Sequence, residues 1–462
     1  MDLNVSFDYP KVRFDKENEV VLSTRLKAPS VDDDDRQPLN LVACLDISGS
    51  MCGQKMDRMK KTVQVLVDHM TEQDKLGIVV FSTNFTKLAS VQSMTSDRKI
   101  ELKERVSRLY ATNSTNISGA MLLGFELLGV RENDLNRVLL LTDGLPNVGE
   151  TTIPGLVELA GNRPKGVSIS TFGFGADHNP ELLQSMANAG GGNYYFIENA
   201  DQISSSFAQE LGGLISCYAQ NVKIEATFKS GVLDVDMLNK AWEWEYDEEK
   251  LIVRIPELIA EEDKNILAKI KLDKRSSSLP RGVTIADVKI SYTNLITKKN
   301  EVVETKAKIE FVKKGDESQE RDHEIVKQEA RLMAAEAQKQ AAEMATAGNF
   351  AGAQMILCSA ASSLDSIGDK AWATDLKEFS NCFTPQTYST SVEYSANSRS
   401  YGLSRGRVAG QTVGCSADMA NAAQKSMMRS FSEGEQKDDK DDKKDKGKKS
   451  KKKGKKYNPM TS

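Results

Sequence analysis

Three short polar segments of this 462-residue chain carry side chains whose oxygen atoms could bind a divalent metal ion. The first is DISGS, which places one carboxylate and two hydroxyl groups at alternate positions. In an extended segment alternate residues face the same side, so Asp46, Ser48 and Ser50 can project together. Hard oxygen donors of this kind suit Mg²⁺ or Mn²⁺, whereas zinc and copper favour His or Cys.

Two later segments supply further ligands. NSTNISGAM places Thr115 just before an expected helix, and LLLTDG places Asp143 just after an expected strand. DISGS likewise follows an apolar run, LNLVACLD. In open parallel sheets, ligands bind at the carboxyl ends of strands near a switch in strand order. The sequence therefore predicts one metal site, formed by Asp46, Ser48, Ser50, Thr115 and Asp143.

The elements that must position these residues follow an alternating pattern. Residues 39 to about 213 alternate strand-like and helix-like segments, which predicts an α/β domain with a mainly parallel sheet. KMDRMKKTVQVLVDHM carries apolar residues at helical spacing. KLGIVVFS, NRVLLLTDG and GVSISTFGFG contain apolar runs typical of strands that are buried on both faces.

DISGSM, STNISGA and LLLTDG together resemble the metal-ion-dependent adhesion site of von Willebrand factor type A (VWA) domains. In that family the matching Asp, two Ser, Thr and Asp hold Mg²⁺ directly or through water. A Glu or Asp of a protein ligand commonly completes the shell. The resemblance covers roughly residues 39 to 213. It implies a Rossmann-like fold, Mg²⁺ or Mn²⁺ as cofactor, and a protein partner that presents a carboxylate.

The rest of the chain suggests further units. Residues 1–36 contain a strand-like segment, EVVLSTRLKA, that we expect to join a β-sandwich. The VWA domain then spans 37–214, and the alternating segments of 215–315 predict the sandwich itself. Residues 316–384, rich in Ala, Glu, Gln and Lys, predict a helical hairpin region. The Ser-rich and then Lys/Asp-rich residues 385–462 predict disorder.

This overall layout resembles the VWA region of plant RING-type ubiquitin ligases. The similarity includes IVKQEARLMAAEAQKQAAEMATAGNFAGAQMILCSAASSL and, more loosely, YSTSVEYSANSRSYGLSRGRVAGQ. The sequence has neither the Cys nor the His residues of a RING. The resemblance therefore implies partner binding and leaves a RING-less adaptor in ubiquitin transfer as an alternative. A weaker likeness extends to the secreted inter-alpha-trypsin inhibitor heavy chains.

The net charge of −4 is unevenly distributed. Twelve Lys and five Asp lie between Lys437 and Lys456, a sum of +7, so the other residues sum to −11. An acidic body with a basic tail is not typical of nucleic-acid binding, and we expect no nucleic-acid partner. Without an apolar run at the start or a membrane-length apolar stretch, we expect a cytoplasmic protein, with nuclear import through the tail as the alternative.

No catalytic pattern such as GxSxG, HExxH or a P-loop is present, so we do not expect an enzyme. A Mg²⁺-dependent hydrolase is the least favoured alternative, because no general base stands out. The six Cys residues form no CxxC pair. We interpret His178 as a surface residue and Cys52 as a small residue in a turn. Trp242 and Trp244 are expected to share one face of a strand.

Overall fold

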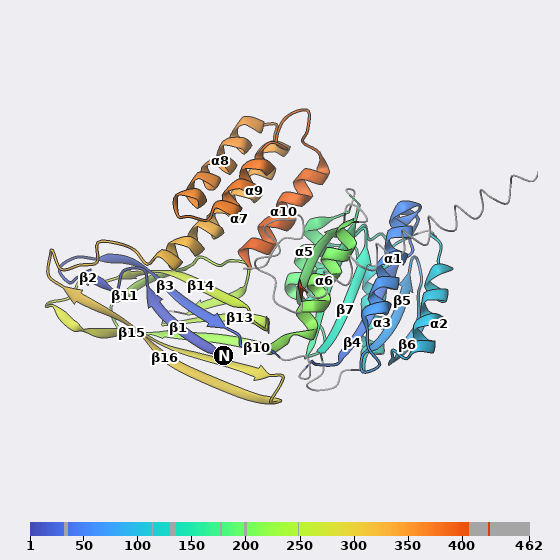
Figure 1. Cartoon of the computed structure of the whole chain (residues 1–462), viewed down its shortest axis with the longest axis horizontal. Helices are drawn as coiled ribbons and strands as arrows, with labels where there is room; N and C mark the ends of the chain where they lie inside the picture. The colour runs from blue at the N-terminus through green and yellow to red at the C-terminus, as the bar shows by residue number, and fades with distance from the viewer. Residues whose placement is uncertain are drawn as a thin grey trace, which may run out of the picture.

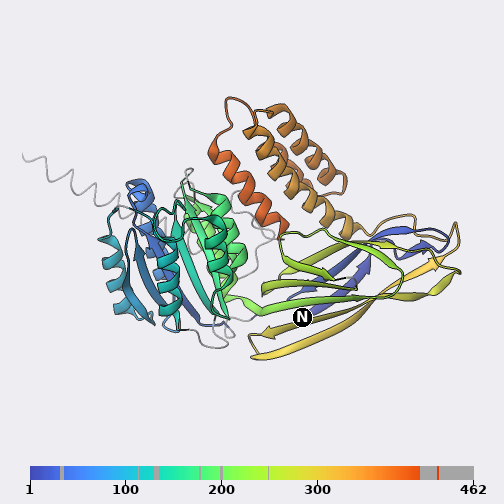
Figure 2. The same ribbon diagram turned by 180° about the vertical axis from the view of Figure 1, so that it is seen from behind.

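The computed structural model of the chain describes residues 1–31, 36–112, 114–129, 135–175, 178–197, 201–247, 249–405 and 424–425. Three units are apparent: an α/β domain, a β-sandwich and a group of helices that lies over the region where the first two meet (Figures 1 and 2). The predicted α/β fold with a mainly parallel sheet is confirmed. Most of the residues predicted to bind metal lie at or just after the carboxyl-terminal ends of strands in this sheet.

The α/β domain is built on a six-stranded sheet in the order β6-β5-β4-β7-β8-β9. Five strands are parallel and β6 pairs antiparallel with β5 at the edge. The strands are β4 (Leu39–Asp46), β5 (Lys75–Phe81), β6 (Phe85–Ser93), β7 (Leu135–Thr142), β8 (Val167–Phe174) and β9 (Gly191–Ile197). Every residue of β4, β7 and β8 is buried, because helices cover both faces of the sheet.

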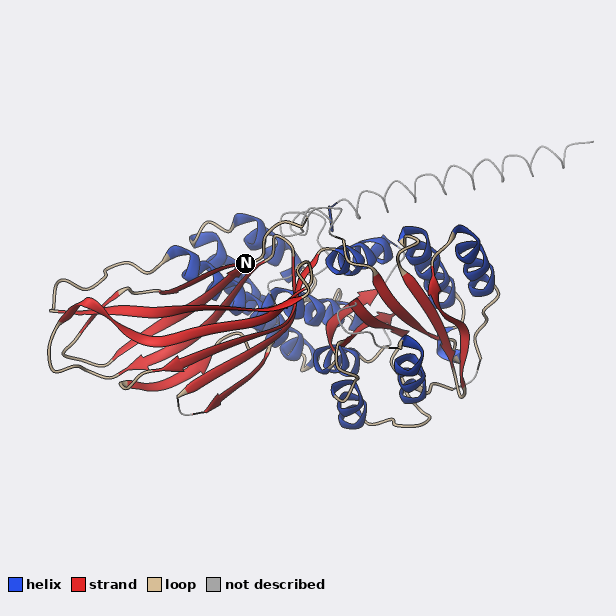
Figure 3. Cartoon of the chain, turned by 90° about the horizontal axis from the view of Figure 1, so that it is seen from below, coloured by secondary structure: helices blue, strands red, loops and turns tan. Residues whose placement is uncertain are grey.

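Helices pack on the two faces of this sheet in sets of three (Figure 3). One core contains α1 (Gln54–His69), α2 (Ser96–Ser107) and α6 (Asp201–Ile215). The opposite core contains α3 (Ile117–Leu128), α4 (Ile153–Gly161) and α5 (Pro180–Ala189). Side chains of Thr95, Asn116, Thr152 and Asn179 cap the helix starts by accepting backbone N–H bonds, which fixes where the loops end.

The β-sandwich combines strands from before and after the α/β domain. Its first sheet has the order β1-β3-β14-β11 and its second the order β12-β13-β10-β15-β16-β2. The strands are β1 (Asp2–Phe7), β2 (Lys11–Arg13), β3 (Asn18–Lys27), β10 (Cys217–Phe228), β11 (Val232–Met237), β12 (Glu243–Asp247), β13 (Lys250–Ile259), β14 (Asp263–Leu272), β15 (Leu279–Asn294) and β16 (Lys299–Val312). Apolar side chains of both sheets form one core, to which Leu22 and Ile224 belong.

Four helices follow the sandwich: α7 (His323–Thr346), α8 (Phe350–Ser366), α9 (Lys370–Ser380) and α10 (Thr390–Ser404). Helix α7 contacts β14 of the sandwich, whereas α10 contacts β9 of the α/β domain. The expectation of disorder from residue 385 is wrong for α10, because this helix packs through Ala396 and Leu403 into the core of the helical unit. Most of the remaining tail lies outside the described residues.

None of the helices in the described parts of the chain has the length and apolar composition needed to cross a bilayer.

Candidate functional site

The DISGS loop begins where β4 ends. Strand β4 lies between β5 and β7, so the strand order reverses at β4 and the loops after these strands diverge. This is the position at which open α/β sheets bind ligands. Asp46 is the last residue of β4 and is fully buried. Ser48 is also buried, whereas Ser50 is exposed at the rim.

Hydrogen bonds within the loop draw its three predicted ligands together. The Ser48 backbone N–H donates to Oδ1 of Asp46 at 2.8 Å, which closes a tight turn. The hydroxyl oxygens of Ser48 and Ser50 lie 3.0 Å apart. The Thr142 hydroxyl, from the end of β7, donates to Oδ2 of Asp46 at 2.5 Å. The Asp46 carboxylate is thus held in place from both its own loop and the neighbouring strand.

Asp143 directly follows β7 and its side chain is fully buried. Its Oδ1 has no hydrogen-bond partner among the described residues, and its Oδ2 forms an ion pair with Lys55 Nζ at 3.1 Å. Gly144 has a φ of 67°, a left-handed conformation that glycine adopts without strain. A buried carboxylate oxygen without a donor is costly unless a cation or water satisfies it, so this atom fits a metal ligand.

Thr115 belongs to a loop that is hydrogen-bonded to both the DISGS loop and the loop after Asp143. The Thr112 N–H donates to the Ile47 carbonyl at 2.6 Å, which fixes this loop beside DISGS. The Thr115 N–H donates to the Asn147 side chain at 2.8 Å, and the Thr115 carbonyl accepts from the Asn147 N–H at 3.0 Å. The Thr115 hydroxyl has no hydrogen bond to any described residue and is thus available as a ligand.

The electrostatics of the site also favour a cation. The pKa of Asp46 is raised to about 6, mainly because the carboxyl group is buried; the nearby Asp143 carboxylate also raises it, and hydrogen bonds from Thr142 and Ser48 offset part of the rise. Two carboxylates that share a buried site repel each other, and a divalent cation between them would remove that repulsion. No cluster of three His, Cys, Asp or Glu side chains occurs in the described residues, so a cation here depends on hydroxyl oxygens as well.

Three residues of this site were not predicted from the sequence: Lys55, Thr142 and Asn147. Lys55 lies in the first turn of α1, and a basic residue just after an acidic loop is a sequence signal for a nearby carboxylate. Thr142 directly precedes Asp143, and the buried Thr142 hydroxyl holds Asp46 through a hydrogen bond. Asn147 connects the Thr115 loop to the Asp143 loop and lies too far along the sequence for local spacing to reveal it.

Some other sequence interpretations are corrected. His178 is not a surface residue, because its ring is buried and its Nε2 lies 2.6 Å from the Tyr194 hydroxyl. Trp242 precedes β12 and is buried beneath the Arg405 guanidinium, whereas Trp244 lies within β12 and is partly exposed. The two Trp side chains therefore occupy different environments. Cys52 is exposed in the turn before α1.

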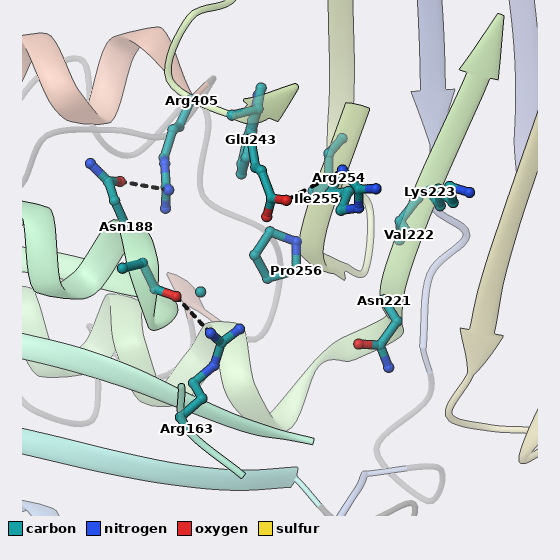
Figure 4. Close-up of a pocket in the computed structure, with 13 residues that line it drawn as sticks. Arg163, Asn188, Asn221, Val222, Lys223, Glu243, Arg254, Ile255, Pro256 and Arg405 are labelled. Atoms are coloured by element: carbon teal, nitrogen blue, oxygen red, sulfur yellow. Dashed lines mark hydrogen bonds and ion pairs between the residues drawn. The ribbon is translucent and has the colours of Figure 1, made fainter. Parts of the chain in front are cut away.

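A cavity of about 300 Å³ lies where the α/β domain, the sandwich and the end of α10 meet (Figure 4). Arg163 lines it and donates to the carbonyls of Val167 and Ala189, both at 2.6 Å. Arg405 donates to the Asn188 side chain at 2.7 Å. None of the five predicted metal ligands lines this cavity, so it is separate from the DISGS site.

Sequence comparisons match residues 40–209 to the model of the von Willebrand factor type A domain. YfbK of Escherichia coli (strain K12) is 29% identical over 214 residues, which cover 45% of this chain and 35% of that protein. Inter-alpha-trypsin inhibitor heavy chain H3 of Mus musculus is 31% identical over 160 residues, 32% of this chain and 18% of its own. This chain thus spans less than half the length of either relative.

Solved structures share the fold over a longer range. A von Willebrand factor type A protein from Catenulispora acidiphila covers 82% of this chain and 89% of its own, with a TM-score of 0.65 and 15% identity. The ArnB paralog VWA2 from Sulfolobus acidocaldarius covers 87% of this chain and 97% of its own, with a TM-score of 0.58 and 17% identity. Residues 40–209 of this chain are a von Willebrand factor type A domain, and the shared architecture extends beyond it.

Proposed function

We propose that this protein is a metal-dependent protein-binding module that captures an acidic side chain of a partner at the DISGS site. Asp46, Ser48, Ser50, Thr115 and Asp143 would hold Mg²⁺ or Mn²⁺. The bound ion would supply a Lewis-acidic position for a carboxylate oxygen. The chain's own residues orient these ligands, through the turn at Ser48 and the Thr142 hydroxyl bond to Asp46.

The single observation that carries the proposal is the buried Asp143 carboxylate beside Asp46. Its Oδ1 lacks a hydrogen-bond partner among the described residues. Such an arrangement is unfavourable in a protein that only needs to fold, because a buried carboxylate oxygen without a hydrogen-bond partner lowers stability. A divalent cation resolves both the repulsion and the missing partner.

Affinity purification of the full chain tests this proposal. The tagged protein is incubated with lysate in Mg²⁺ or in EDTA, and captured proteins are identified by mass spectrometry. We expect a partner that is retained in Mg²⁺ and lost in EDTA. Asp46→Asn should lose the same partner. Asp68→Asn, which changes an exposed carboxylate on α1, is the matched control and should retain it. An identical set of proteins under all conditions would refute the proposal.

The alternative of an adaptor in ubiquitin transfer is favoured by the helical region. Met333 of α7 and Met355 of α8 are 63% and 72% exposed, on two helices that pack against each other. Exposed methionines suit adaptable protein contacts. A ubiquitin-conjugating enzyme or RING protein that co-purifies in EDTA, and is lost in the double variant Met333→Lys/Met355→Lys, would support this role. Cytoplasmic localisation stays a prediction, which fractionation tests.

A further inference from the structure

Lys55 lies inside the proposed metal site although it belongs to no predicted ligand set. It is the second residue of α1, the helix that begins just after the DISGS loop. Its Nζ is 3.1 Å from Oδ2 of Asp143, and the two side chains are 15% and 0% exposed. An ion pair this sheltered from solvent is screened far less than one on the surface.

Lys55 also supplies positive charge to the site in the absence of metal. Among the described residues, no other Lys or Arg comes within ion-pair distance of Asp46 or Asp143. The two carboxylates are both fully buried, and Lys55 forms its ion pair with that of Asp143. The Lys55 ammonium group carries one positive charge, whereas a divalent ion carries two.

We propose that Lys55 is a built-in competitor of the metal: a tethered cation that stabilises Asp143 in the metal-free protein and weakens divalent-ion binding. This inference rests on the proposed function. Asp143 Oδ2 is bonded to the ammonium, while Oδ1 is open. A divalent ion held through either oxygen would share one carboxylate with Lys55, and two cations on one carboxylate repel each other. Metal binding therefore weakens the Lys55–Asp143 ion pair.

The consequence is a threshold on metal occupancy. The metal-free domain stays folded because Asp143 keeps Lys55 as its counter-ion. The divalent metal ion binds only when its concentration is high enough to compete with the Lys55–Asp143 ion pair. Lys55 is part of a helix start at the rim of the site, so an ammonium that leaves Asp143 remains close to the position of an incoming acidic partner. Metal loading and attraction of a carboxylate are thereby coupled through one side chain.

Three variants of the full chain test this inference by calorimetric titration with Mg²⁺ and Mn²⁺. Lys55→Met removes the charge and keeps a long side chain, and should tighten metal binding about tenfold or more, equivalent to about 1.4 kcal/mol or more. Lys55→Arg keeps the charge and should bind metal no more tightly than the wild type. Lys61→Met, at an exposed position on the same helix, is the matched control and should behave as the wild type.

Thermal unfolding gives an independent readout. In EDTA, Lys55→Met should melt below the wild type, because Asp143 loses its counter-ion, and saturating Mg²⁺ should raise its melting temperature more than that of the wild type. If this variant folds only in Mg²⁺, that rescue supports the inference. Lys55→Gln, which keeps a hydrogen-bond donor without charge, should change in the same directions.

The outcomes separate this inference from the proposed function. Equal metal affinity of the wild type and Lys55→Met would overturn the competitor role and leave the metal site standing. Failure of both neutral variants to fold even in Mg²⁺ would also overturn it, since Lys55 would then be needed for folding with or without metal. An absence of metal binding in the wild type and in Lys55→Met would instead count against the proposed function itself.

Discussion

Arg137 of β7 and Glu257 of β13 form a buried ion pair that joins the VWA domain to the β-sandwich. The same guanidinium also pairs with Glu210 of α6. Arg137 lies near the start of β7 and Asp143 follows its end, so one strand connects the domain junction with the proposed metal site.

Arg137→Met should destabilise the protein strongly. It leaves Glu210 and Glu257 buried without their cation, and breaking a buried ion pair in this way typically costs about 3–5 kcal/mol. Urea unfolding of the full chain measures the loss. Arg108→Met, which removes a mostly exposed guanidinium, should change stability by less than about 1 kcal/mol. A similar small change in both variants would show that the junction does not depend on this pair.

Acid should weaken the same junction. Burial alone would raise the pKa of Glu210, but the Arg137 charge and hydrogen bonds from Ser170 and Asn193 outweigh it and hold the pKa below the ordinary 4.5. The folded-state pKa is thus lower than the unfolded one, so this stabilisation is present above about pH 4.5 and is lost as the pH falls further. Melting temperatures between neutral pH and pH 3 should fall less steeply in Glu210→Gln than in the wild type. Parallel curves would contradict this.

Thr142→Val should loosen Asp46. The Thr142 hydroxyl donates to Asp46 at 2.5 Å and accepts from the Gly144 N–H at 2.9 Å, so a nearly isosteric Val leaves both groups short of a partner. We expect a loss of about 1–3 kcal/mol in the free energy of unfolding and weaker metal binding. Thr142→Ser retains the hydroxyl and should keep most of both. Denaturant unfolding and metal titration of the two variants measure these effects. Equal stability and equal metal affinity of Thr142→Val and Thr142→Ser would refute the role of the Thr142 hydroxyl.

Helix α10 should stabilise the VWA domain. The Tyr401 hydroxyl and the Arg405 guanidinium donate to the Gly192 carbonyl at 3.3 and 2.9 Å, and the Tyr394 ring packs edge-on against His178. Truncation after Ser389 removes these contacts, so we expect faster amide exchange in α5 and β9 by mass spectrometry. Unchanged exchange in these two elements would mean that α10 contributes little there.

The proximity of the candidate ligands could be predicted because it depends on local order. Asp46, Ser48 and Ser50 lie within one turn, and the apolar runs before Asp46 and Asp143 indicate parallel strands that end at one edge. The pairing of Lys55 with Asp143 joins residues 88 positions apart, and nothing in either segment specifies the other. Which cation reaches which carboxylate is decided by tertiary packing.

The elements that were missed lack a regular apolar pattern. Strand β6 lies at the sheet edge and is largely exposed, so its sequence shows little burial. Helix α10 contains many polar residues and is held by specific contacts, such as the bond from Arg399 to the Gln338 side chain at 3.0 Å. His178 is buried because Tyr194 and the Gly175 carbonyl satisfy both ring nitrogens. Partners of this kind become visible only in the folded chain.

Titration of the metal-free full chain with Mn²⁺, followed by electron paramagnetic resonance, tests the central claim most directly. The account predicts one class of saturable site in the wild type and in Asp68→Asn, competition by Mg²⁺, and loss of that site in Asp143→Asn. Absence of saturable binding in the wild type, or unchanged binding in Asp143→Asn, would contradict it.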